Sequence, residues 1–118
     1  MSSERTYVDY LRDIVEAAEN AETFISTMDY DTFAEDTKTV YAVTRALEII
    51  GEAAKRIPET IRLSHPEIPW RLMAGTRDQV IHGYFRVDLA RVFETVRQDL
   101  PPMRGAVERL LDELEPSS

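Results

Sequence analysis

The stretch VYAVTRALEIIGEAAKRI, residues 40–57, places apolar side chains on two faces of one predicted helix. The first stripe is spaced by three and four residues and consists of Val40, Val43, Leu47, Ile50, Ala54 and Ile57. The second stripe, beside it, consists of Ala42, Ala46, Ile49 and Ala53. A helix with two apolar stripes must be covered on two sides, so we expect it to be central or to lie at a subunit contact. Pro58 ends it.

The segments on both sides of this helix repeat the same spacing. The first stripe is formed by Tyr7, Leu11, Ile14, Ala18, Ala21, Ile25 and Met28. Asp29-Tyr30-Asp31 breaks that helix and offers a capping carboxylate for the next one. The last stripe is formed by Leu89, Phe93, Val96, Leu100, Met103, Val107, Leu110 and Leu114. It stays in phase across Pro101-Pro102, which predicts a kink or a brief break in the C-terminal helix and not a domain boundary.

Two shorter elements complete the prediction. Prolines punctuate residues 58–69, where a single helical turn around Glu59–Leu63 is expected. A short helix is predicted from Trp70 to about His82, with Gly75 inside it or marking a break and Gly83 as its stop. No segment shows strand-like alternation. The sequence therefore predicts an all-α fold over a single domain, residues 1–118: an antiparallel bundle of four main helices plus one short helical turn.

Composition narrows the functional classes. The chain has 118 residues, of which 43% are hydrophobic, and it has no cysteine. Thiolate nucleophiles, disulfides and cysteine-based zinc sites are excluded. No stretch approaches a membrane span, so we expect a soluble cytoplasmic protein. The net charge of −8 lies entirely within residues 1–36, which hold ten acids and two arginines. That acidic face is either simply solvated or docks a basic partner, and either way any RNA binding should be local.

The chemistry is concentrated in RDQVIHGY, residues 77–84. Histidine takes and gives protons near neutral pH, and arginine grips phosphate through two parallel hydrogen bonds. His82 and Arg77 are therefore the candidate catalytic pair for phosphate chemistry. Asp78 and His82, four apart on a helix, share a face and could hydrogen-bond. These two residues make a poor metal site, because no third ligand occurs at helical spacing, and no cofactor is expected.

Arg77 and His82 project about 140° apart on a regular helix, so one helix cannot easily aim both at one phosphate. Two arrangements would solve this. The helix could end at His82, so that the turn at Gly83 reorients the His82 imidazole towards Arg77. Alternatively, a symmetric dimer could form one site from Arg77 of one subunit and His82 of the other. We favour the dimer, because the second stripe on residues 42–53 offers an apolar surface for it.

Three blocks together carry a family resemblance: GEAAKRIP at residues 51–58, PEIPW at 66–70, and RD at 77–78 followed by HGY at 82–84. In this order they resemble the HEPN superfamily, and more specifically the HepT-like toxins encoded beside a minimal nucleotidyltransferase antitoxin. The resemblance implies a homodimeric, metal-independent endoribonuclease of a type VII-like toxin–antitoxin pair. Arg77 and His82 match its catalytic pair, and Asp78 falls at a variable polar position. The resemblance also implies that the partner enzyme silences the toxin by attaching AMP to the motif tyrosine, Tyr84.

Structural interpretations of the same residues stay open. His82 could be a buried histidine bonded to Asp78, and Arg77 could form a surface salt bridge. His65 is expected to be an exposed loop residue, and Trp70 to anchor the short helix instead of stacking on a base. The alternative function is a non-catalytic HEPN helical dimer that binds a nucleotide or serves as a scaffold for a nucleotidyltransferase.

Overall fold

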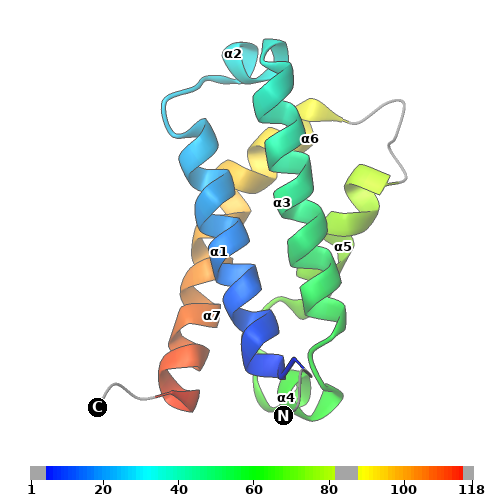
Figure 1. Ribbon diagram of the computed structural model, residues 1–118, viewed down its shortest axis with the longest axis vertical. Coiled ribbons are helices and arrows are strands. Elements are labelled where there is room, and N and C mark those ends of the chain that lie inside the picture. Colours follow the sequence, from blue (N-terminus) through cyan, green and yellow to red (C-terminus); the bar gives the residue numbers. More distant parts are fainter. Residues whose placement is uncertain (1–4, 82–87, 116–118) are drawn as a thin grey trace.

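Helix α3 (Thr37–Lys55) lies between α1 (Tyr7–Ile25) and α5 (Trp70–Ile81) in the computed structural model, and α7 (Leu100–Leu114) packs on α1 from the other side (Figure 1). The structure describes residues 5–81 and 88–115, with side chains in the first range described as far as Thr76. The remaining elements are α2 (Tyr30–Glu35), α4 (Glu59–Ser64), α6 (Leu89–Glu94) and the π-helical turn η1 (Thr95–Asp99). Over the described ranges every regular element is helical, which confirms the all-α prediction.

The first stripe of α3 forms the centre of the core. Val43, Leu47 and Ile50 are completely buried, as is Leu11 of α1. Burial of each such side chain contributes about 1.5–3 kcal/mol relative to an exposed one. Ala46 and Ala53 of the second stripe are also buried. The helix is central, as one of the two predicted arrangements required.

The first connection differs from the prediction. Helix α1 ends at Ile25, although the apolar spacing continues to Met28, which lies in the turn and packs on the core. Asp29 caps the separate short helix α2 by accepting a hydrogen bond of 2.8 Å from the Thr32 amide. A different carboxylate, Asp36, caps α3. The Phe33 side chain of α2 is fully buried in the core, and this burial holds the short helix in place.

The irregularity predicted at Pro101-Pro102 lies on the N-terminal side of the two prolines. They occupy the first turn of α7, and the preceding turn, η1, is π-helical, with the Leu100 amide donating to the Thr95 carbonyl. A proline has no amide hydrogen, and its ring clashes with the carbonyl four residues earlier. The carbonyl four residues before Pro101 belongs to Arg97, and the one four residues before Pro102 belongs to Gln98. Both lie inside η1, so the wider π-helical turn relieves the clash with the proline rings.

An ion pair ties the last helix to the first. Arg104 of α7 donates from Nε to Glu22 Oε2 at 2.7 Å and from Nη2 to Glu22 Oε1 at 3.0 Å. Hydrogen bonding to Glu22 raises the pKa of the Arg104 guanidinium above its ordinary value. Both side chains are largely covered, at 27% and 20% exposed. Such a two-pronged arginine–carboxylate pair fixes orientation as well as adding energy.

None of the helices in the described ranges is long and apolar enough to cross a lipid bilayer.

The Asp29 cap predicts a pH dependence of stability. The Thr32 backbone amide lowers the pKa of the Asp29 carboxyl below its ordinary value of 3.8. A carboxylate with a depressed folded-state pKa stabilises the fold above that ordinary value, and the stabilisation is lost as pH falls through the folded pKa. Asparagine caps as well as aspartate but does not titrate. We expect Asp29→Asn to have the wild-type melting temperature at pH 7. Between pH 5 and pH 2.5 its melting temperature, measured by circular dichroism, should fall by less than that of wild type.

The comparison variant is Asp29→Ala, which supplies no acceptor and should melt at a lower temperature than wild type at pH 7. If Asp29→Asn showed the same drop on acidification as wild type, this cap would not contribute to the acid sensitivity.

Candidate functional site

Helix α5 carries the first half of the predicted catalytic motif, and its start is firmly anchored. The Trp70 indole Nε1 donates to the His65 carbonyl at 3.0 Å, and the ring is 9% exposed. Ile68 and Met73 are buried beside it. Trp70 therefore anchors the helix, as predicted. His65 lies in the loop after α4, as predicted, but its side chain is only 22% exposed, and its Nδ1 lies 3.3 Å from Glu67 Oε2.

One buried hydroxyl fixes the register of α5 on α3. Thr76 is completely buried, and its Oγ1 lies 2.9 Å from the Leu47 carbonyl of α3 and 2.7 Å from the Met73 carbonyl of its own helix. A hydroxyl has a single hydrogen, which these two acceptors share. Since Thr76 immediately precedes Arg77, this contact fixes the backbone next to the predicted catalytic arginine.

The four predicted site residues fall on both sides of the described boundary. Arg77 and Asp78 lie in the second half of α5, which is helical as far as Ile81. Gly75 lies inside the helix and does not break it. His82 and Tyr84 lie outside the described residues. The Arg77–His82 geometry, the Asp78–His82 hydrogen bond and the stop at Gly83 therefore stay predictions.

The apolar surface that favoured a dimer is mostly used within the chain. Ala46 and Ala53 are 5% and 4% exposed, whereas Ala42 and Ile49 are only partly covered. Intramolecular packing therefore accounts for most of the second stripe of α3. Pooling of catalytic residues in a dimer stays a prediction, and it does not follow from this stripe.

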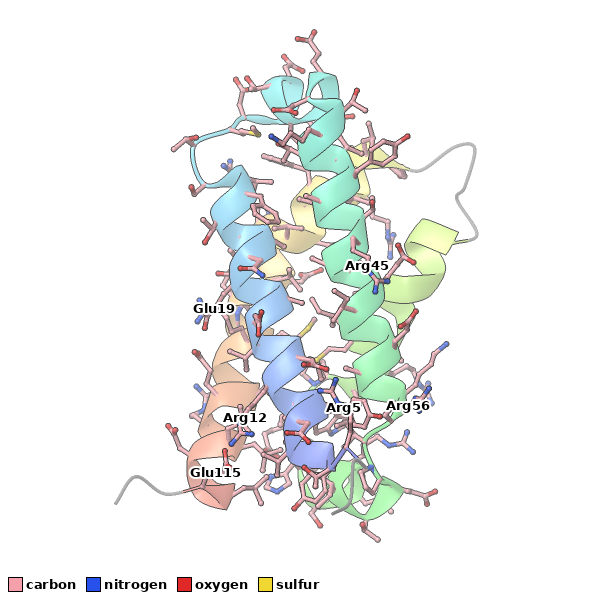
Figure 2. The ribbon with its side chains drawn as sticks, viewed as in Figure 1. Arg5, Arg12, Glu19, Arg45, Arg56 and Glu115 are labelled. Carbon is pink, nitrogen blue, oxygen red and sulfur yellow. The ribbon has the colours of Figure 1, made fainter. Side chains whose placement is uncertain are left out.

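A groove between α1 and α3 was not anticipated. It encloses about 410 Å³ and is rimmed by Arg5, Arg45 and Arg56. Figure 2 shows Arg5 and Arg56 at the same level of the molecule and Arg45 further along α3. The sequence signal that could have indicated it is the eleven-residue spacing of Arg45 and Arg56, which puts both on one helical face.

Among the described side chains, no group of three or more histidines or carboxylates is arranged to hold a metal ion.

Comparison with known proteins gives one consistent result. The family described as "Ribonuclease HepT-like" matches residues 14–110. A Thermococcus cleftensis protein named "Probable ribonuclease HepT" is 50% identical over 106 residues, covering 90% of this chain and 96% of that protein. "Putative RNase MJ1216" of Methanocaldococcus jannaschii is 40% identical over 106 residues, covering 90% and 88%. No solved structure gives a significant match.

The Thr76 contact predicts a specific loss of stability. Thr76→Val keeps the shape of the side chain but removes the buried donor, and this should lower the free energy of unfolding by about 1–2 kcal/mol. Urea unfolding measures the change. Thr44→Val is the matched control, because the Thr44 hydroxyl donates to the Tyr41 carbonyl at 3.0 Å in an exposed setting. Equal losses in the two variants would contradict a special role for the α3–α5 contact.

Proposed function

This chain belongs to the HepT-like ribonuclease family of the HEPN superfamily, and we propose that it is a metal-independent endoribonuclease toxin. The observation that carries the proposal is the position of Arg77 on helix α5, directly after the buried Thr76, with His82 five residues further along the sequence. Both residues lie within the matched range 14–110.

The reaction follows from the chemistry of RNA. The 2′-oxygen attacks the adjacent phosphorus, the bond to the 5′-oxygen breaks, and a 2′,3′-cyclic phosphate and a free 5′-hydroxyl result. A base must take the 2′-hydroxyl proton and an acid must protonate the departing 5′-oxygen. Histidine performs both tasks near neutral pH, so His82 supplies the proton transfers. Arg77 holds the phosphate oxygens as negative charge builds on them.

A homodimer would supply two copies of each group. Because Arg77 and His82 project about 140° apart on a regular helix, pooling across subunits allows one histidine to act as base and the other as acid. Asp78, four residues before His82, would orient the imidazole.

Regulation by a partner is the second part of the proposal. The cognate minimal nucleotidyltransferase would transfer AMP from ATP to the Tyr84 hydroxyl: the phenol oxygen bonds to the α-phosphorus, the bond between the α- and β-phosphates breaks, and pyrophosphate leaves. The added phosphate would bring negative charge two residues from His82, where it would repel the substrate phosphate, and the adenosine would block access to the catalytic pair.

Cleavage of single-stranded RNA in excess chelator tests the enzyme. We expect His82→Ala to lower the cleavage rate at least ~100-fold, because the proton transfers are lost. Arg77→Lys should also fail, since an ammonium is a point charge and does not reproduce the planar guanidinium fork. The rate is measured by gel separation of labelled fragments.

Matched controls exist for both substitutions. His65→Ala removes the other histidine but leaves its carbonyl to bind Trp70, and Arg71→Lys changes an exposed arginine of the same helix. Both should cleave at the wild-type rate. If His82→Ala matched wild type, or if wild type did not cleave RNA, the non-catalytic scaffold or nucleotide-binding dimer would replace the enzyme. Cleavage by a protein that sediments as a 13.6 kDa monomer would contradict the pooled site.

Co-expression with a minimal nucleotidyltransferase tests the modification. Mass spectrometry should find one AMP on the peptide that contains Tyr84, and cleavage activity should fall with the modified fraction. Tyr84→Phe should stay unmodified and active in the presence of the transferase. Tyr41→Phe is the control, because Tyr41 is 72% exposed and offers a transferase another accessible phenol. AMP on any residue other than Tyr84 would disprove this regulation.

A further inference from the structure

The groove between α1 and α3 is lined by both apolar and charged side chains. Its floor is apolar and consists of Ala17, Ile49 and Ala53. The rim on the α3 side carries Arg45 and Arg56, and the opposite rim on α1 carries the hydrogen-bonding side chains Glu16 and Asn20. At about 410 Å³ the groove is in the size range of small-ligand sites.

The three arginines of the rim are not equivalent. Arg5 is neutralised, because its Nη2 donates to Asp13 Oδ2 at 2.7 Å. Arg45 has only a loose partner, Glu48 Oε2 at 3.9 Å, and its side chain is 63% exposed. Within the described part of the chain no ion pair is recorded for Arg56. Arg45 and Arg56 are therefore the cations with capacity for an external anion.

An aromatic ring positions one of these two cations. The Arg56 guanidinium lies 5.9 Å from the centroid of the Tyr10 ring, and the Arg5 guanidinium lies 4.9 Å from it. Attraction between a cation and the face of an aromatic ring holds both at the lower end of the groove. Tyr10 itself packs on the core, so this end of the rim is fixed.

The spacing of Arg45 and Arg56 favours an extended ligand. Eleven residues separate them, which corresponds to about 16 Å along the helix axis and only ~20° around it. In Figure 2 the two arginines project from α3 at different heights along it. A single small anion cannot reach both, whereas a strand with successive phosphates can.

The acidic groups of the lining exclude a simple anion and favour a ligand that also donates hydrogen bonds. Glu16 and Glu52 line the groove and would repel bare phosphate. A carboxylate such as that of Glu16 can accept hydrogen bonds from ribose hydroxyls and from base amino groups, and the 2′-hydroxyl is a donor that DNA lacks. The apolar floor accommodates the flat face of a base.

We propose that this groove binds a segment of single-stranded RNA outside the catalytic motif, with phosphates on Arg45 and Arg56 and ribose or base donors on the α1 side. The proposal rests on the proposed ribonuclease function. Arg45 lies two residues before Leu47, whose carbonyl binds Thr76 at 2.9 Å next to Arg77. A strand that leaves the groove at Arg45 is therefore about one helix diameter, ~10 Å, from α5.

The test measures binding of a labelled single-stranded oligoribonucleotide to the full chain carrying His82→Ala, so that no RNA is cut. Adding Arg45→Ala or Arg56→Ala should weaken binding about tenfold each, because each removes a charge-assisted hydrogen bond to phosphate. Each should also reduce the slope of log affinity against log salt by about 0.7. With His82 restored, both changes should lower the ratio of kcat/KM on the long RNA to kcat/KM on a dinucleotide.

Arg109→Ala is the control. It removes one exposed arginine from α7, which packs on α1 away from α3, and it should leave both the affinity and the salt slope unchanged. Melting temperatures establish that each variant is folded.

Three results would overturn the groove assignment. The first is a salt slope for Arg45→Ala and Arg56→Ala equal to that of Arg109→Ala. The second is displacement of the RNA by an equal concentration of free AMP, which would make the groove a free-nucleotide site, and the third is dissociation of a dimer into monomers on sedimentation of Arg45→Ala or Arg56→Ala, which would make it a subunit contact. None of these depends on cleavage. Absence of cleavage by wild type would instead refute the ribonuclease, so the two failures are distinguishable.

Discussion

Burial of α3 on two sides is the constraint on which the rest of the structure depends. Its first stripe is buried except for Val40, which is partly buried, and Ala46 and Ala53 beside it are covered as well. Helices must then pack on both faces, and α1 and α5 do so. Small side chains in the second stripe allow close approach at little cost in side-chain entropy. The same helix thereby presents one face to the candidate catalytic helix and another to the α1–α3 groove.

This arrangement links stability to function through the end of α5. A helix whose start is fixed by Trp70 and whose later part is fixed by Thr76 has little freedom to slide or rotate on α3. Catalysis by positioned groups depends on such rigidity, because a displacement of about 1 Å costs much of the rate. Arg77 directly follows Thr76, so the hydrogen bond of Thr76 to α3 also fixes the position of the Arg77 backbone.

The acidic first helix is partly explained by internal contacts. Asp9 completes the capping box at Thr6, Asp13 pairs with Arg5, and Glu22 pairs with Arg104. These carboxylates hold the N-terminus and α7 in place, which is a more specific role than solvation alone. Glu16 belongs instead to the groove. The local charge balance of that groove differs from the net charge of −8, as expected when charges of both signs are segregated by the fold.

The sequence by itself determined the helical class, the helical turn around Glu59–Leu63, the anchoring role of Trp70 and the family, because apolar spacing, prolines and the ordered motif blocks are all local signals. It left α3 either central or at a subunit contact, and tertiary packing on α1 and α5 decided for the central place. It did not reveal α2, since this six-residue segment is too short to show a helical repeat, and the Asp29 cap together with burial of Phe33 on the core stabilises it as a helix. It placed the irregularity of the last helix at the prolines, whereas the strain falls on the carbonyls of the preceding turn. The α1–α3 groove was decided by tertiary structure alone. Its rim joins residues 5–20 to residues 45–56, and no local pattern records which helix faces meet.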